Sequence, residues 1–427
     1  MERYSEYKDS GVKWLGEIPS HWKVKRLASF FIERRVKVSD KDYEPLSVTK
    51  RGVFPQWENV AKTNDGDNRK LVKKGDFVIN SRSDRKGSSG VSDRDGSVSL
   101  INIVLQPRDT IRADFSNYLL KSYKFIEEFY RNGRGIVADL WTTRFDEMKM
   151  IKLAIPTIEE QIAIAKYLDS VTAKIDEAIA QQQKMIDLLN ERKQIIINKV
   201  VTKGLDSNVK MKSSGIDWIG EIPEHWNMCK LGALGTTING ISHDSTYFGS
   251  GFPFVSYSDV YKNYALPAEV NGLAQSSMSE RNVFSVCEGD VFFTRTSETA
   301  EEIGFTSTCL KTIPNAVFAG FLIRFRPKVG YLDKNFSKYY FRAPIHRSYF
   351  VKEMNLVIRA SLSQQLLKGL IVLLPPIKEQ VAIASYLDKR VCEIDNLIIN
   401  YKKQISLLQE RKQIIINDVV TGKVKVI

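Results

Sequence analysis

The chain carries one ordered set of motifs twice, and this duplication constrains its fold more than any other feature. The segment Gly11–Trp22, which ends in Pro-Ser-His-Trp, returns as Gly215–Trp226, 204 residues later (215 − 11). The segment Pro156–Asp169 returns as Pro375–Asp388, 219 residues later (375 − 156). The repeated motifs, here called the frame, therefore predict two halves of similar architecture that enclose sequences of different content.

A long apolar stripe follows the second motif in each half. Neither proline nor glycine occurs between Glu159 and Val201, and the second copy runs from Lys378 to Thr421. This pattern predicts two coiled-coil helices of roughly 65 Å each, at 1.5 Å per residue. The residues that repeat every seven are Leu168, Ile175, Gln182, Leu189 and Ile196 in the first helix, and Leu387, Ile394, Tyr401, Leu408 and Ile415 in the second.

Each stripe needs a partner, and each helix finds its nearest equivalent in the other. Both contain the same octapeptide, at Glu191–Asn198 and Glu410–Asn417. An approximate two-fold relation between the halves predicts that the helices pack antiparallel. A parallel pair would require the second half to run back along the whole helix. The polar pair Gln182 and Tyr401 either fixes the register or marks a partly exposed break in the stripe.

The sequences enclosed by the frame combine strand and helix patterns. Segments such as Asp76–Asn80 and Ala316–Phe325 indicate short strands, whereas Asn117–Arg131 and Lys334–Arg347 indicate helices. The predicted fold class is therefore α/β (α+β), with two pseudo-symmetric mixed α/β domains joined by two long antiparallel coiled-coil helices. The predicted boundaries are residues 1–158 for the first domain, 159–203 for the central helix, 204–377 for the second domain and 378–427 for the distal helix.

The composition limits which binding partners and which cellular compartment we expect for this chain. The net charge of +13 favours a polyanionic partner, although a solvated basic surface would give the same balance. No apolar run approaches the roughly 20 residues of a membrane span, and the N-terminus is polar, so we expect a cytoplasmic protein with no membrane partner. The cysteines, all in the second half and without a C-x-x-C pair, indicate reduced thiols.

Catalytic motifs are missing from the sequence. It contains no phosphate-binding loop, G-x-G-x-x-G, H-E-x-x-H or G-x-S-x-G motif, and no convincing nuclease or amino-methyltransferase motif. The repeated histidines His21 and His225 each precede a tryptophan in a tight turn, which favours a structural role. We therefore predict a chain that is not an enzyme by itself and holds neither metal nor cofactor.

Polar loops in corresponding places differ between the halves. Ser81–Arg94 is rich in glycine, serine and arginine, whereas the loop from Thr294 to Glu302 is not. Arginine can pair with guanine edges and serine with phosphate, so these loops are candidates for DNA reading, although solvated hairpins look similar. Trp141–Arg144 and Arg359–Ser363 either cap short helices or approach DNA. The candidate DNA-binding residues are Lys50, Arg51, Arg82, Arg85, Lys86, Ser88, Ser89, Arg94, Arg134, Thr143, Arg144, Arg295, Thr296, Ser297, Thr299, Arg359 and Ser361.

These doubled motifs resemble those of the specificity subunit of Type I restriction-modification enzymes. The resemblance rests on Trp-x-Gly-x-Ile-Pro-x-His-Trp at Trp14–Trp22 and Trp218–Trp226, and on Pro-x-x-x-Glu-Gln before each long helix. It implies two target recognition domains, each reading one half of a bipartite site in double-stranded DNA. The helices would set the spacer and dock two modification subunits.

The same resemblance places the chemistry on partner subunits. S-adenosylmethionine would bind the modification subunits, and ATP and Mg would serve the restriction and translocase subunits. Two other readings of the sequence remain open: a nuclease or methyltransferase subunit with degenerate motifs, and a coiled-coil interaction scaffold.

Overall fold

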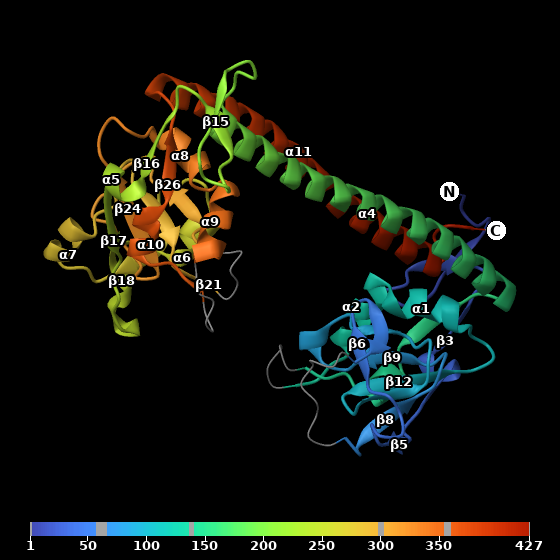
Figure 1. Ribbon diagram of the computed structural model, residues 1–427. Helices are drawn as coiled ribbons and strands as arrows, with labels where there is room; N and C mark the ends of the chain where they lie inside the picture. The colour runs from blue at the N-terminus through green and yellow to red at the C-terminus, as the bar shows by residue number, and fades with distance from the viewer. Residues whose placement is uncertain (1, 57–65, 136–140, 298–302, 354–359, 427) are drawn as a thin grey trace. The chain divides into compact units, whose positions relative to one another are not determined.

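A computed structural model describes residues 2–56, 66–135, 141–297, 303–353 and 360–426 and divides the chain into two compact units (Figure 1). Unit 1 holds residues 1–183 and 402–427, and unit 2 holds residues 184–401. The helices α4 (Ile158–Lys203) and α11 (Ile377–Val420) each contribute to both units. Each unit is a mixed α/β domain, which confirms the predicted fold class.

Unit 1 is built on a four-stranded antiparallel sheet of order β10-β9-β12-β4. All four residues of β9 are buried, as a short apolar strand in the centre of a sheet requires. The strands of this sheet are β4 (Phe31–Glu33), β9 (Phe77–Asn80), β10 (Ser89–Val91) and β12 (Asn102–Pro107). A second sheet holds β5 (Lys37–Val38), β8 (Arg69–Val72) and β11 (Gly96–Ser99), and a hairpin is formed by β6 (Leu46–Thr49) and β7 (Gly52–Pro55).

Unit 2 repeats this arrangement with the order β22-β20-β24-β17. Strand β20 corresponds to β9, and β24 corresponds to β12, so the sequences enclosed by the frame build the same central sheet twice. The strands of the four-stranded sheet are β17 (Gly235–Asn239), β20 (Val291–Thr294), β22 (Thr306–Thr308) and β24 (Leu322–Pro327). A second sheet holds β18 (Phe248–Val255), β19 (Gly272–Ala274) and β23 (Val317–Phe318).

The first motif of each half forms a hairpin followed by a strand that pairs with the strand before the long helix. In unit 1 this strand is β3, which pairs with β13 over four residues, and in unit 2 it is β16, which pairs with β26. Strand pairing therefore holds the two motifs of each half together. The elements are β1 (Tyr7–Asp9), β2 (Glu17–Pro19), β3 (Lys23–Arg26), β13 (Lys152–Ile155), β14 (Met211–Ser213), β15 (Glu221–Pro223), β16 (Asn227–Lys230) and β26 (Ile371–Leu374).

The helices predicted near Asn117–Arg131 and Lys334–Arg347 are each divided in two. Ser122 separates α1 from α2, because its backbone is extended and its side chain accepts a hydrogen bond from Phe125 N as a helix N-cap. In unit 2 the segment around Pro344 separates α8 from α9. The helices are α1 (Ala113–Lys121), α2 (Tyr123–Arg131), α3 (Phe145–Met148), α5 (Leu231–Leu234), α6 (Tyr257–Lys262), α7 (Met278–Val283), α8 (Lys334–Tyr340), α9 (Ile345–Glu353) and α10 (Gln364–Gly369).

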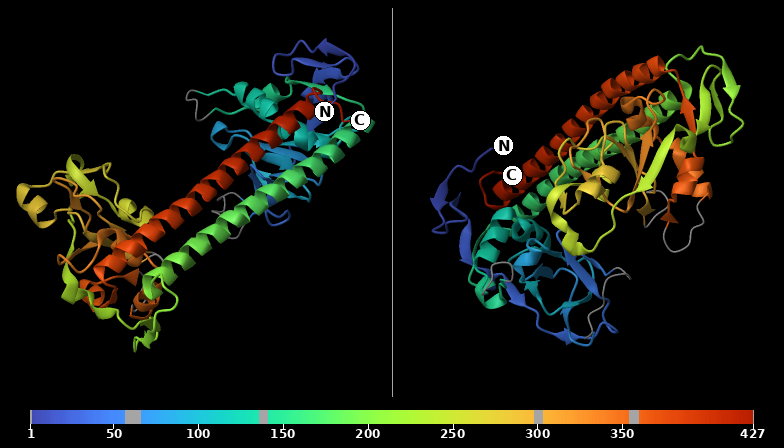
Figure 2. Two further views of the ribbon diagram at one scale, coloured as in Figure 1. Left: turned by 90° about the horizontal axis from the view of Figure 1, so that it is seen from above. Right: turned by 90° about the vertical axis from the view of Figure 1, so that its left-hand side faces the viewer.

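Within each unit, α4 and α11 pack antiparallel (Figure 2). In unit 1 Lys412 Nζ lies 2.6 Å from Asp176 Oδ2, and in unit 2 Lys193 Nζ lies 2.6 Å from Asp395 Oδ1. From the first ion pair to the second, the residue number increases in α4, from Asp176 to Lys193, and decreases in α11, from Lys412 to Asp395. The helices are therefore antiparallel, which confirms the predicted direction. Leu168, Ile175, Leu189, Leu387, Ile394 and Ile415 of the predicted stripe are buried.

The stripe drifts at the end of α4, where Ile197 is fully buried and Ile196 only partly. A helix of 3.6 residues per turn moves away from a seven-residue repeat in this way. The polar residues Gln182 and Tyr401 are half-buried. Along the described part of the chain, no helix has an apolar stretch long enough to cross a membrane. All four cysteines are free thiols.

Candidate nucleic-acid interface

A buried glutamate ties the two motifs of unit 1 together. Glu160, at the start of α4, places Oε2 2.9 Å from His21 Nε2 and accepts a hydrogen bond from Trp22 Nε1 at 3.2 Å on Oε1. Tyr4 also donates to Oε1, at 2.7 Å, and burial together with this carboxylate raises the pKa of Tyr4. The turn that carries His21 is thereby fixed to the first turn of the long helix.

Unit 2 builds the same anchor with Glu379. Its Oε2 lies 2.9 Å from His225 Nε2 and accepts from Trp226 Nε1 at 3.1 Å. The glutamine after each glutamate is repeated as well: Gln161 accepts from Arg112 N and Gln380 from Asp333 N. Both histidines thus lie in the frame, where the sequence predicted a structural role, and their partner is the glutamate of the second motif.

Two polar loops that are far apart in the sequence meet in unit 1. Arg82 and Thr142 form an antiparallel bridge, and Ser83 N donates to Trp141 O at 2.9 Å. Arg134 pairs with Thr142 on the other side through two backbone hydrogen bonds of 3.0 and 3.1 Å. The backbones of Arg82, Thr142 and Arg134 therefore form three adjacent extended segments, which bring together candidates that the sequence placed in separate clusters.

Polar hollows lie on both sides of the turn that contains Arg82 and Arg85. The first has a volume of about 400 Å³ and the second about 460 Å³, and both reach Ile101. Each hollow holds basic side chains together with carboxylates, Glu33 and Asp146 in the first and Asp84 in the second. Cationic residues of the first hollow are Arg35, Lys70, Arg82 and Arg144, and those of the second are Lys50 and Arg85.

The exposed cations of this region differ in how far they are neutralised. Lys86 pairs with Glu127 at 2.7 Å, Arg94 with Asp93 at 2.9 Å, and Arg134 with Glu147 at 3.6 Å. Among the described residues, no carboxylate lies within ion-pair distance of the exposed side chains of Lys50, Arg51, Arg82 and Arg144. Exposed cations without such a partner are available to the phosphates of a nucleic acid.

Three candidate hydroxyls of unit 1 are buried. Ser88 is 7% exposed, and Ser89 and Thr143 are fully buried. Thr143 donates its hydroxyl to Phe129 O at 3.0 Å, and the equivalent position of unit 2 holds the buried Leu362. The geometry favours a role for Ser88, Ser89 and Thr143 inside the loop, and their contact with DNA stays a prediction.

Unit 2 presents different chemistry on the same backbone arrangement. Strand β21 (Thr296–Ser297) pairs with β25 (Ala360–Ser361), and Thr296 lies opposite Ser361 as Arg82 lies opposite Thr142. Arg295 is half-buried, and its carbonyl accepts from Leu362 N at 2.7 Å. A hydroxyl therefore replaces the guanidinium at the equivalent place. The candidates Thr299 and Arg359 lie outside the described residues.

Two turns next to these loops carry exposed apolar residues that were not among the sequence candidates. Leu100 and Ile101 connect β11 to β12 and are 40% and 37% exposed, and Phe321, between β23 and β24, is 64% exposed. Ser81 N donates to Ile101 O, and Arg295 N donates to Phe321 O. A loop residue of this kind gives no signal in a single sequence, because its exposure depends on strand pairing.

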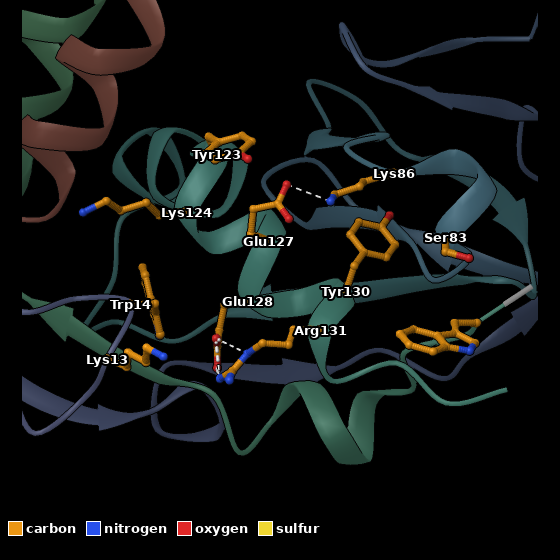
Figure 3. A pocket seen from close by; sticks show the side chains of 11 residues that line it. Lys13, Trp14, Ser83, Lys86, Tyr123, Lys124, Glu127, Glu128, Tyr130 and Arg131 are labelled. Atoms are coloured by element: carbon orange, nitrogen blue, oxygen red, sulfur yellow. Dashed lines mark hydrogen bonds and ion pairs between the residues drawn. The ribbon is translucent and has the colours of Figure 1, made fainter. Parts of the chain in front are cut away.

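A groove of about 710 Å³ follows α2 between the turn Lys13–Trp14 and the loop Ser83–Lys86 (Figure 3). The carboxylates in its wall are both paired, Glu127 with Lys86 at 2.7 Å and Glu128 with Arg131 at 2.7 Å (Figure 3). The described lining contains neither histidine nor cysteine. Each of these carboxylates is therefore neutralised by a neighbouring cation of the groove.

Comparison with known proteins identifies the fold and the motifs. Residues 19–186 match the family model of the type I restriction modification DNA specificity domain. The chain is 24% identical to the MjaX type I restriction enzyme specificity subunit of Methanocaldococcus jannaschii, over 98% of each chain. It is 26% identical to the EcoKI specificity subunit of Escherichia coli, over 69% of this chain and 62% of that one.

Solved structures agree with these matches. A chain from a structural study of type I R-M assembly and conformational transition has a TM-score of 0.68 at 16% identity, over 95% of this chain and 99% of that one. The HsdS subunit of Thermoanaerobacter tengcongensis has a TM-score of 0.50 at 16% identity, over 95% of this chain and 98% of its own. With its doubled frame and its antiparallel helices, the chain belongs to the DNA specificity subunits of type I restriction-modification systems.

Proposed function

We propose that each unit of this specificity subunit reads one half of a bipartite DNA site. The observation that carries the proposal is the replacement of Arg82 by Thr296 at equivalent places of one backbone arrangement. A backbone arrangement that is shared by both units but carries different polar side chains is suited to reading two different DNA sequences. Arginine pairs with guanine through two hydrogen bonds, whereas a threonine hydroxyl contacts either a base or a phosphate.

We assign the proposed DNA contacts from the exposure and the charge of each candidate side chain. In unit 1, Arg82 and Arg144 face the bases, and Lys50, Arg51, Arg85 and Arg134 hold the phosphates. Lys86 and Arg94 reach DNA after exchange of their ion-pair partners. In unit 2 the proposed contact residues are Arg295, Thr296, Ser297, Thr299, Arg359 and Ser361.

The subunit is the non-catalytic part of a multisubunit restriction and methylation enzyme, and cofactors belong to its partner subunits. We propose that two modification subunits bring S-adenosylmethionine and that restriction and translocase subunits use ATP and Mg, in the cytoplasm. In this proposal residues 1–158 and 204–377 are the target recognition domains, and residues 159–203 and 378–427 set the spacer.

The octapeptide supports docking of one partner type at two places. Part of its identity is structural: Lys193 and Lys412 form the helix-to-helix ion pairs. Its exposed residues form no such ion pair with another described residue, yet they too are the same in both copies. Ile195 and Ile414 are 58% and 52% exposed. An exposed side chain that is the same in both copies can make the same contact with two copies of a partner protein. We therefore propose that this stretch contacts the two modification subunits.

Exchange of residues 1–158 for the corresponding block of a relative tests the function. Methylation by the reconstituted complex, mapped across a genome, should then change in one half-site and stay the same in the other. A map in which neither half-site changes would contradict the proposal. Methylation or cleavage of DNA by the purified chain alone would support the rival reading as a catalytic subunit.

A salt titration tests the contact at Arg82. We expect Arg82→Ala to weaken specific DNA binding by about 1–3 kcal/mol and to relax the preference at one base pair, with little change in the slope of log K against log salt, because Arg82 is assigned to a base. Arg51→Ala, at a residue assigned to a phosphate, should instead reduce that slope by about 1. Arg82→Lys should keep the slope but lose preference at one base pair, since lysine lacks the planar fork. Arg112→Ala is the matched control, because Arg112 is exposed, is paired with Asp114 and is not among the proposed contacts.

A further inference from the structure

The turns Leu100–Ile101 and Gly320–Phe321 occupy the same place in the two units. Each connects the strand before it to the central strand, β12 in unit 1 and β24 in unit 2. Each also accepts a backbone hydrogen bond from the reading loop, at 3.3 Å from Ser81 N to Ile101 O and at 2.9 Å from Arg295 N to Phe321 O. The second residue of the turn is therefore fixed beside the polar loop in both units.

Both positions hold an apolar side chain that the fold does not bury. Ile101 is 37% exposed and Phe321 is 64% exposed, although neighbouring residues of β12 and β24 are buried. A single exposed apolar residue is ordinary on a protein surface. Exposed apolar side chains at equivalent places of both units, next to Arg82 in one and Thr296 in the other, favour an external partner.

The surroundings limit what that partner is. Ile101 forms part of both polar hollows, which hold the carboxylates Glu33, Asp146 and Asp84 as well as basic side chains. Arg82, Arg144 and Lys50 have no carboxylate partner among the described residues, so these cations favour an anionic ligand, and Ile101 favours one that also offers an apolar group. Duplex DNA combines the two, because the 5-methyl group of thymine is the apolar feature of the major groove.

We propose that Ile101 and Phe321 each contact a thymine methyl group, one in each half-site, and thereby contribute to base specificity. This inference rests on the proposed function and names a specificity determinant for each unit. The side chains differ in shape, an aliphatic branch against a flat ring, so the thymine need not occupy the same position in the two half-sites.

Uracil substitution tests the contact directly, because uracil is thymine without the methyl group. The site is first identified by methylation mapping, and each of its thymines is then replaced singly by uracil. With the complete complex of specificity and modification subunits, one such replacement in each half-site should weaken binding by about four-fold, as expected for one buried methyl group. Competition binding at fixed salt measures the change.

The variants then assign each methyl group to its side chain. Phe321→Ala should bind thymine and uracil equally at one position of its half-site and keep the four-fold difference in the other half-site. Ile101→Ala should do the reverse. Phe321→Leu should retain a difference of about two-fold, since part of the apolar contact remains. Val329→Ala is the matched control, because Val329 is fully exposed at the opposite end of β24.

Two results would overturn the inference without affecting the proposed function. One is site-specific binding that no uracil replacement weakens. The other is a uracil penalty that persists unchanged in both Phe321→Ala and Ile101→Ala. Loss of the proposed function looks different: the complete complex would bind DNA without any sequence preference, whether or not uracil is present.

Discussion

At the scale of single residues, the two glutamates of the frame are similar but not equal. Glu160 serves three partners, His21, Trp22 and Tyr4, whereas Glu379 serves His225 and Trp226. The Glu160 side chain is 8% exposed and that of Glu379 is 25% exposed. The anchor of unit 1 is therefore the more deeply buried and the more fully hydrogen-bonded.

Removal of the carboxylate should cost more in unit 1 than in unit 2. We expect Glu160→Ala to lower the free energy of unfolding by about 2 kcal/mol, because Trp22 Nε1 loses its acceptor in a buried site. Glu379→Ala, the matched control, should cost less. Hydrogen exchange in the first turns of α4 and α11 measures the two effects locally. Equal loss of protection in both variants would contradict the comparison.

A second glutamate of unit 2, Glu280, is held in its ionised form by hydrogen bonds. The carboxylate of Glu280 accepts a hydrogen bond from Ser277 N and lies 2.9 Å from His243 Nε2, and Tyr247 donates to it at 3.1 Å. The backbone hydrogen bond from Ser277, followed by the contact with His243, lowers the pKa of Glu280 to about 2. The same contacts fix the N-terminus of α7.

The lowered pKa of Glu280 predicts how the stability of α7 changes with pH. The folded pKa lies below the value of about 4.3 in an unfolded chain, so the stabilisation is complete above that value. It is lost as the pH falls toward about 2. Amide protection in α7, corrected for intrinsic exchange, should therefore decrease over this range. Glu280→Gln should show a smaller decrease, and an equal decrease in both proteins would contradict the assignment.

At the scale of elements, the long helices were the most predictable part of the fold. Their direction and most of their buried stripe agree with the sequence, because a seven-residue repeat is a local signal that extends over many turns. The interruptions at Ser122 and near Pro344 were missed. A capping serine within an amphipathic segment differs little from a surface serine until its backbone conformation is known.

Charge reversal tests the helix pairing inside unit 1. We expect Lys412→Asp to destabilise the unit, because it faces Asp176 with a like charge. The double variant with Asp176→Lys should recover most of the loss. A coupling energy of about 0.5–1 kcal/mol is expected for a partly exposed pair. Urea unfolding of the four proteins of the cycle measures it, and additive effects would contradict the contact.

The corresponding reversal of Lys193 and Asp395 is the matched control in unit 2. The Lys193 side chain is 13% exposed, compared with 25% for Lys412. Screening by water is weaker around the more buried lysine. We therefore expect at least as large a coupling energy in unit 2, and a much smaller one would show that burial does not govern these pairs.

At the scale of the whole molecule, both long helices pass from one compact unit to the other. The passage lies after Gln183 in α4 and after Tyr401 in α11. The proposed function assigns the helices the role of a spacer. Their length should therefore set the gap between the two half-sites.

Insertion of four residues at both of these points tests the spacer. One added helical turn is about 6 Å, or about two base pairs of duplex DNA. We expect the methylated site to keep its two half-sites and to gain about two base pairs between them. Methylation mapping of the reconstituted complex measures the gap, and full activity with an unchanged gap would exclude the spacer role.

The sequence by itself determined the duplication, the long helices and the presence of candidate reading loops, because these depend on repeats and periodicity along the chain. Only the tertiary structure decided which candidates meet. It placed Arg82 against Thr142 and put Thr296 in the equivalent place of unit 2. It also buried Thr143 and left Phe321 exposed. Strand pairing between distant segments sets these relations, and residue type alone does not encode them.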